Sequence, residues 1–277
     1  MDKADQYLNR LQHLPPAPTV AVQLLDLLAD PNQRVDRFVE LVRHDPALTA
    51  KIMQRCNRAC FSTTEPASDM FEVVLRLGFY EVYCVVATAL GSDLMSLGQA
   101  HTDPNLTRLW RHSVMTAVAA GELAKRVEAP TGVAFTAGLL HDLGKQVFAV
   151  AETTKYVQLM ALNGASGLNL VEQEQEFFGV NHAVIGARLL RRWGLPESIA
   201  QATERHHDAA GDGTALGAVI QLANRLAHHL ADAAPAVGEI PALPSHSTEL
   251  LGLTAHDLPP LLTQIQFGLQ RVEGFSR

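Results

Sequence analysis

One short segment constrains the fold of this chain more than any other: GLLHDLGK at residues 138–145. It sets an imidazole, a carboxylate and an ammonium within an apolar helical pattern, between two glycines. An unpaired carboxylate in such surroundings is costly, so Asp142 requires a cation or another partner. A glycine inside a helix costs about 1 kcal/mol relative to alanine, so Gly138 and Gly144 make sense if another backbone approaches closely there.

The rest of the chain shows apolar residues at helical spacing and no clear strand pattern. Asp45-Pro46 supplies an N-cap followed by proline at the first helical position, and Gly78 separates two helical patterns. The expected helices lie at about 20–28, 35–43, 46–56, 70–77, 80–94, 106–127, 132–150, 154–163, 169–178, 181–193, 196–207, 214–231 and 258–272, with loops at 208–213 and 233–247. The sequence therefore predicts an all-α fold in which residues 138–145 belong to one continuous helix.

A polar, turn-rich stretch at 98–107 divides the helical patterns into two groups. We expect an N-terminal helical lobe at 1–97 and a second helical lobe at 98–277. A chain of 277 residues with 47% hydrophobic content can bury enough apolar surface for one large domain or two smaller ones.

Composition argues against several classes of partner. The formal charge is −7 and no Lys/Arg run forms a basic stripe, so we expect no nucleic-acid partner. The most apolar stretch, 73–90, contains Arg76 and Glu81 and is typical of a buried helix rather than a membrane span. The first residues have no apolar core of signal-peptide length, and the three cysteines form no C-x-x-C pair. These features predict a cytoplasmic protein without membrane contact.

Five histidines and one aspartate fall at positions on separate helices that could build one site. They are His112 in WRHS, His141 with Asp142, His182 in GVNHAVIG, and His206 with His207 in ERHHD. Imidazole nitrogens with a carboxylate oxygen form a ligand set for Fe, Mn, Zn or Ni. A bound ion would lower the pKa of a coordinated water, and Lys145 could offset charge on a substrate phosphate.

Each position also has an explanation that needs no metal. A single His112 is commonly half-buried and hydrogen-bonded to a backbone carbonyl. The Asp142 carboxylate could pair with His141 or Lys145 alone. The His206-His207 pair could be a solvated helix end. The remaining pattern predicts surface positions for four other histidines, namely His228, His229, His246 and His256. The collective pattern favours a shared site.

The quoted segments resemble a known superfamily. RHS at His112, GLLHDLGK, NHAVIGARLLRRWGLP at 181–196 and ERHHD at 204–208 resemble the HD superfamily of metal-dependent phosphohydrolases. LPPAPTVAVQLLDLLADP at 14–31, HDPALTAKIMQRCN at 44–57 and LG at 77–78 resemble the HDOD family, the HD-related output domain of bacterial signal transduction. The resemblance covers residues 10–270 and implies an all-helical HD-like fold with an N-terminal helical lobe, used as an output or scaffolding module.

The resemblance also implies a partly eroded metal site. The six residues match ligand positions of the related HD-GYP phosphodiesterases, and Lys145 matches the lysine that follows the HD pair. Asn224 stands where HD enzymes have a late aspartate, Arg108 stands where HD-GYP proteins have a glutamate, and no Gly-Tyr-Pro follows His207. With Asp142 as the one retained anionic ligand among these positions, we expect one divalent ion rather than two.

Three functions remain open at this stage. The first is a regulatory module that acts through signalling proteins, with a metal or a nucleotide bound at the site. The second is a metal-dependent phosphohydrolase for a nucleotide or cyclic dinucleotide. The third is a scaffold whose histidines only form internal hydrogen bonds. The replaced ligands favour regulation, and the sequence does not indicate an oligomeric state.

Overall fold

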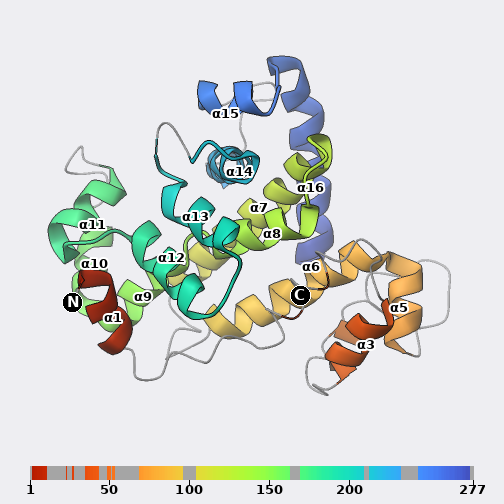
Figure 1. Ribbon diagram of the computed structural model, residues 1–277, viewed down its shortest axis with the longest axis horizontal. Helices are drawn as coiled ribbons and strands as arrows, with labels where there is room; N and C mark the ends of the chain where they lie inside the picture. Colours follow the sequence, from red (N-terminus) through yellow and green to blue (C-terminus); the bar gives the residue numbers. More distant parts are fainter. Residues whose placement is uncertain are drawn as a thin grey trace.

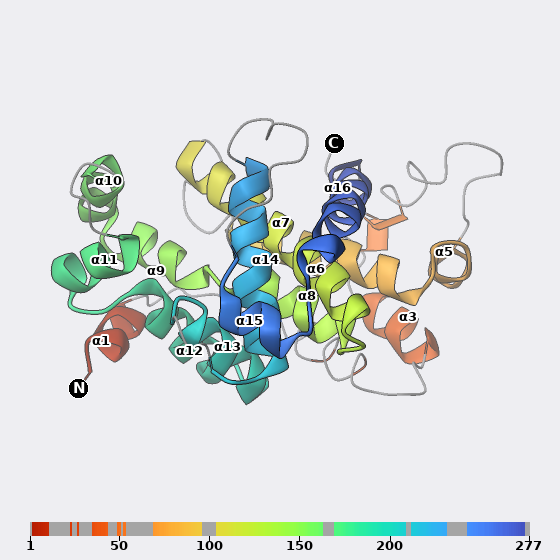
Figure 2. The same cartoon turned by 90° about the horizontal axis from the view of Figure 1, so that it is seen from above.

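The computed structural model describes residues 2–10, 35–43, 69–95, 104–162, 169–208, 212–231 and 243–274, with isolated positions at 23, 27, 49–50 and 52–53. These residues form helices joined by turns, and they include no strand, which confirms the all-α prediction. In Figures 1 and 2, α3 and α5 lie at one end of the molecule and the larger helical bundle occupies the rest.

The N-terminal part contains α1 (Lys3–Arg10), α3 (Val35–Arg43), α5 (Met70–Leu77) and α6 (Phe79–Met95). Gly78 ends α5 with a φ of +87°, a conformation that side-chain-bearing residues rarely adopt. The apolar stretch 73–90 is therefore two helices, as the sequence predicts. Among the described residues, no helix is long and apolar enough to cross a membrane.

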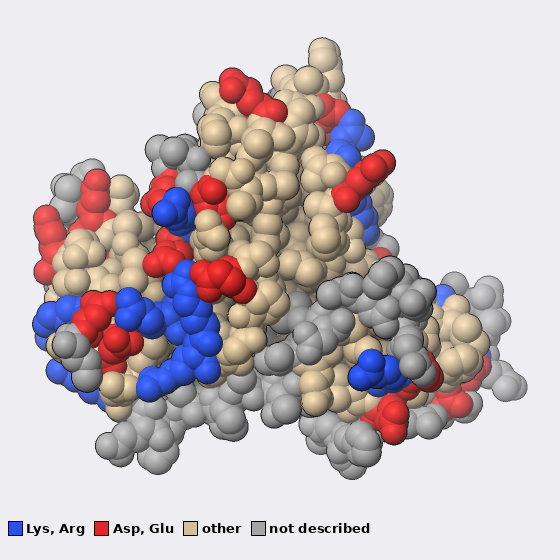
Figure 3. Space-filling model, viewed as in Figure 1, with Lys and Arg blue, Asp and Glu red and all other residues tan. Residues whose placement is uncertain are grey.

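The first helix, α1, lies against α9 and α12 of the larger bundle, far from α3 and α5 (Figure 1). The Tyr7 ring packs edge-on against Phe148 and Phe178, and the Arg188 guanidinium pairs with Asp2 and Asp5. Figure 3 shows acidic and basic side chains side by side over α1 and α12. This helix is not among those expected from the sequence. The boundary between lobes at 97–98 stays a prediction, because residues 96–103 lie outside the described part. The same holds for most of the expected helices at 20–28 and 46–56.

The larger bundle is built around the long helix α7, with the shorter helix α8 beside it and α14 packed against both (Figure 2). Its elements are α7 (Pro104–Arg126), α8 (Thr131–Leu140), α9 (Leu143–Ala151), α10 (Thr153–Leu162), α11 (Leu170–Phe178), α12 (His182–Arg192), α13 (Glu197–Arg205), α14 (Ala215–Ala231), α15 (Ser245–Leu250), the 3-10 helix η2 (Ala255–Asp257) and α16 (Leu258–Gly274). The short α15 falls partly in the predicted loop 233–247.

The predicted continuous helix at 132–150 is wrong, because α8 ends at Leu140 and α9 begins at Leu143. The imidazole Nδ1 of His141 donates to the Gly138 carbonyl at 2.8 Å, and carbonyls at a helix end lack an amide partner. The apolar pattern continues on both sides of the break, so periodicity does not reveal it. As a result, His141 and Asp142 occupy the junction between two helices.

The two glycines of this segment do meet neighbouring backbones. A Cβ on Gly138 would lie 2.9 Å from the Ala117 Cα in α7. A Cβ on Gly144 would lie 1.9 Å from the His182 carbonyl oxygen and 2.9 Å from the Gly186 amide nitrogen in α12. The predicted close approach of another backbone is therefore confirmed at both positions.

We expect Gly144→Ala to lower the free energy of unfolding by about 1–3 kcal/mol or more, because the added methyl group collides with backbone that cannot move alone. Gly268→Ala in α16 is the matched control, since its Cβ would meet a side-chain methyl group of Val118. Both variants gain about 1 kcal/mol of helix propensity. Chemical denaturation measures the difference, and equal stability of the two variants would contradict the backbone contact.

Candidate metal centre

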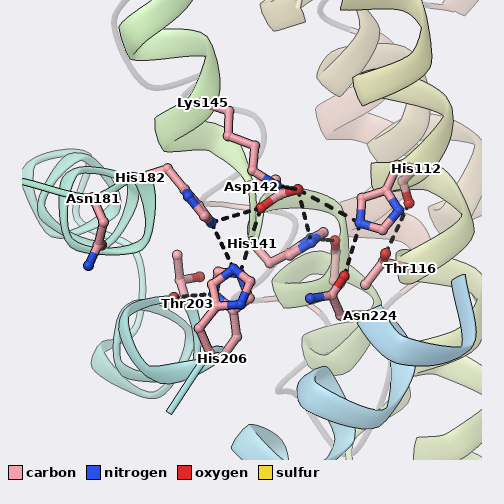
Figure 4. Close-up of polar contacts among 12 residues, drawn as sticks. His112, Thr116, His141, Asp142, Lys145, Asn181, His182, Thr203, His206 and Asn224 are labelled. Carbon is pink, nitrogen blue, oxygen red and sulfur yellow. Dashed lines mark hydrogen bonds and ion pairs between the residues drawn. The ribbon is translucent and has the colours of Figure 1, made fainter. Parts of the chain in front are cut away.

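The structure brings every predicted site residue to one place, between five segments that are distant in sequence (Figure 4). These residues are His112 on α7, His141 and Asp142 at the α8–α9 junction, Lys145 on α9, His182 at the start of α12, His206 and His207 at the end of α13, and Asn224 on α14.

Two of the imidazoles are oriented by helix ends. His141 follows α8 and His206 follows α13, and each Nδ1 donates to the carbonyl three residues earlier, of Gly138 at 2.8 Å and of Thr203 at 2.6 Å. A helix leaves its last carbonyls without amide partners, so each ring satisfies one of them. The remaining nitrogen of each ring, Nε2, points into the site.

The third imidazole, His182, is oriented by a buried carboxylate that the sequence reasoning missed. The Glu174 Oε2 atom accepts from the His182 backbone amide at 2.8 Å and from its Nδ1 at 2.5 Å. Gly179 ends α11 in the left-handed conformation and Asn181 caps α12, so the chain turns back and sets Glu174 beside His182. The signal was present in the sequence, because Glu174 lies four residues from both Leu170 and Phe178, on the helix face that is buried.

These bonds fix which ring nitrogens carry hydrogen. With Nδ1 donating in His141, His182 and His206, Nε2 is the nitrogen of each ring that faces the Asp142 carboxylate and that can bind a metal ion once it carries no hydrogen. The Nε2 atoms of His182 and His206 lie 3.2 and 3.6 Å from Asp142 Oδ1, and that of His141 lies 3.4 Å from Oδ2. The Nε2 atoms of His141 and His206 and the Oδ1 atom of Asp142 are buried without a hydrogen-bond partner.

This arrangement fits a metal ion. Lone pairs that face a carboxylate repel one another unless a cation lies between them, and buried polar atoms without partners are costly. Two ligands of one ion with bonds of about 2.1 Å lie roughly 3.0–3.4 Å apart, close to the separations observed here. Hydrogen-bonding Nδ1 to a carbonyl or carboxylate is also the usual support of a metal-binding imidazole. His207 is exposed and its Nε2 lies 3.0 Å from that of His182, which adds a further ligand atom.

Burial and neighbouring charges together shift the pKa values of the aspartate and the histidines of the site. Burial by itself would raise the pKa of Asp142, but the neighbouring His141 and Lys145 hold it well below its usual value. Burial lowers the pKa of His206 to about 4 and that of His112 to about 2. Burial is the largest effect on His182 and acts against its charged form, but the Glu174 carboxylate and the contacts with Asp142 and Glu174 together outweigh it, so this pKa is raised. At neutral pH the site therefore offers a carboxylate together with neutral His206 and His112.

Lys145 is tied to the same carboxylate. Its Nζ lies 2.6 Å from Asp142 Oδ2, and both side chains are buried. The helix break lies between His141 and Lys145, so these two residues do not lie on one face of a continuous helix. The lysine reaches Asp142 from the first turn of α9.

The structure also locates Asn224 and Arg108, the two residues that depart from the HD and HD-GYP patterns. The Asn224 Oδ1 atom lies 3.0 Å from His112 Nε2, so the amide bonds the imidazole where an aspartate is expected. His112 Nε2 lies farther, 3.7 Å, from Asp142 Oδ2. Arg108 is exposed, so its charge is solvated. His228, one turn after Asn224, is exposed as predicted, but its ring lies tilted against that of His112 with centroids 4.3 Å apart.

The remaining histidines agree with the sequence expectation to different degrees. His246 and His256 are exposed, whereas His229 is half-buried. The three buried histidines, His141, His182 and His206, all belong to the cluster around Asp142, and the described histidines outside the site are exposed or half-buried.

The fold and the site together define a class of protein: a helical bundle with a buried cluster of histidines and an aspartate at a helix junction. The model of the HDOD domain family matches residues 14–209. The chain belongs to the HDOD family.

Two solved structures support the fold. An HDOD domain protein with unknown function from Geobacter sulfurreducens has a TM-score of 0.76 and 24% identity, covering 99% of this chain and 95% of that one. The MmoQ response regulator from Methylococcus capsulatus has a TM-score of 0.50 and 27% identity, covering 91% of this chain and 99% of that one.

Two curated relatives are longer proteins. An uncharacterized protein of Treponema pallidum is 27% identical over 72% of this chain, and a ribonuclease Y of Lawsonia intracellularis is 26% identical over 69%. These matches span 39% and 30% of the relatives. The chain therefore spans two fifths or less of the length of the curated relatives it matches.

We expect Glu174→Gln to weaken Mn²⁺ or Zn²⁺ binding by about 10–100-fold, because the neutral amide no longer fixes the His182 ring as firmly. Calorimetric titration of metal into the chelator-treated protein measures the affinity. Glu176→Gln is the control, since Glu176 is exposed on the same helix. Unchanged affinity in Glu174→Gln would show that this carboxylate does not support a metal ligand.

Proposed function

We propose that this chain is a regulatory HDOD module of bacterial signal transduction that binds one divalent transition metal ion, Fe, Mn, Zn or Ni, and acts through contacts with signalling proteins in the cytoplasm. Metal binding is supported by the Nε2 atoms of His182 and His206, which face Asp142 Oδ1. Two of these three atoms, His206 Nε2 and Asp142 Oδ1, are buried without a hydrogen-bond partner. Asp142, His182, His206 and His207 would hold the ion. Bound there, a divalent ion polarises a coordinated water and lowers its pKa.

The ligand set supports regulation over catalysis. Among the predicted ligand positions Asp142 supplies the carboxylate, and its second oxygen is already paired with Lys145. Asn224 bonds His112 instead of offering an anionic ligand. The 27% identity to a protein named as a response regulator supports the signalling assignment.

A metal-dependent phosphohydrolase that acts on a nucleotide or cyclic dinucleotide is the second candidate. It is favoured by the retained histidine ligands and by the likeness to ribonuclease Y, whose name denotes action on RNA. In that case the Lys145 ammonium, which uses one N–H for Asp142, would also contact a phosphate. A scaffold without metal is the third candidate, and the partnerless Nε2 atoms count against it.

Turnover separates the first two candidates. Loaded with Mn²⁺ or Fe²⁺, the protein is expected to release no product from bis(p-nitrophenyl) phosphate, a cyclic dinucleotide, nucleotides or a short RNA. Product formation that His141→Ala abolishes would overturn the regulatory proposal and establish the phosphohydrolase.

Asp142→Ala is expected to lower the melting temperature more with Mn²⁺ than with EDTA. In the presence of metal the variant loses the stabilisation by binding, about 4 kcal/mol at a concentration a thousand times Kd. In EDTA it loses only the pairing with Lys145. Asp257→Ala, which removes the contact with Arg126 at the surface, should give equal shifts in both conditions. Equal shifts in Asp142→Ala would contradict metal binding.

A further inference from the structure

The two oxygens of Asp142 face different surroundings (Figure 4). Oδ1 has no hydrogen-bond partner and faces the Nε2 atoms of His182 and His206. Oδ2 accepts from the Lys145 ammonium at 2.6 Å and lies farther from His141 and His112. The carboxylate thus has one side that lacks a cation and one side that already has one.

The groups that could hold an ion divide in the same way. Asp142 with His182, His206 and His207 forms one set, and Asp142 with His112 and His141 forms the other. A carboxylate that belongs to both sets has the geometry to bridge two ions. The structure therefore provides a frame for two cations, and the question is which cations occupy it.

The second set is weakened as a metal site by its own neighbours. Asn224 Oδ1 can only accept, so the hydrogen bond of 3.0 Å requires a proton on His112 Nε2, which then has no lone pair for a metal. Lys145 covers Asp142 Oδ2. His141 Nε2 is the nitrogen of this set that has no hydrogen-bond partner.

The net charge of the site also disfavours a second metal ion. Counted as ionised, and with the imidazoles neutral as they are when they bind a metal, the described acidic and basic side chains buried around the site are two carboxylates, Asp142 and Glu174, and one ammonium, Lys145. One divalent ion leaves the site with a small net positive charge. A second would add two more charges within a few ångströms of the first ion and of the ammonium, where water screens little.

We propose that the Lys145 ammonium takes the place of a second metal ion, an inference that rests on the proposed function. The chain then holds one metal ion on the Oδ1 side of Asp142 and the lysine cation on the Oδ2 side. Lys145 is therefore a positioning residue that holds Asp142 Oδ2 and leaves Oδ1 facing the single ion. A phosphate contact is not its principal role.

Metal content per chain tests the proposal. The full chain is stripped with chelator, loaded with Mn²⁺, desalted and measured by elemental analysis and electron paramagnetic resonance. Wild type is expected to hold one ion per chain with the signal of an isolated Mn²⁺. The double variant Lys145→Met/Asn224→Asp removes the ammonium and restores a carboxylate, so it is expected to hold two ions with an exchange-coupled signal.

Two controls keep the comparison matched. Lys145→Arg keeps the charge and should stay at one ion, and Lys125→Met removes an exposed lysine and should also stay at one. Circular dichroism confirms that each variant is folded. If the double variant does not fold, Asn224→Asp alone serves: retention of one ion with Lys145 in place supports the proposal, and uptake of two ions overturns it.

The outcomes separate this inference from the function on which it rests. Two coupled ions in wild type, or a folded double variant that still holds one, would overturn the role of Lys145 while leaving metal binding intact. A wild-type protein that binds no ion would overturn the proposed metal-binding function itself.

Discussion

A single buried carboxylate organises this protein. Asp142 has almost no exposed surface, yet neighbouring groups keep its pKa well below the usual range. Ionised carboxylates persist in such surroundings only when cations and hydrogen-bond donors surround them closely. The helix break before α9, the salt bridge from Lys145 and the convergence of separate helices on one point all serve this requirement.

The site is made from ordinary ends of helices. His141 and His206 bond carbonyls that their own helices leave free, and Asn181 caps the helix that begins with His182. Helix termination therefore fixes the orientation of the imidazoles before any ion is considered. Glu174 completes the set from a neighbouring helix. Because each ring is held at Nδ1, the chemistry of the cluster lies in its Nε2 atoms.

The sequence predicted more of the helices than of the connections between side chains. Periodicity gave most helices of the larger bundle within one or two residues, and glycine spacing gave the close backbone contacts at Gly138 and Gly144. The histidine-containing motifs predicted the residues that come together around Asp142. The break before Asp142 was hidden because apolar residues continue through it. The role of Glu174 and the place of α1 depend on packing between distant segments, which a local pattern does not contain.

The contact between Gly144 and the His182 carbonyl has a mechanical consequence. Gly186 lies opposite Gly144, so the backbones of α9 and α12 are in direct contact there, with no side chain between them. Any force that wedges these two helices apart separates Asp142 from His182 directly. An ion held by both Asp142 and His182 would tie the two helices to each other, so by reciprocal linkage any change that separates the helices would weaken binding of the ion.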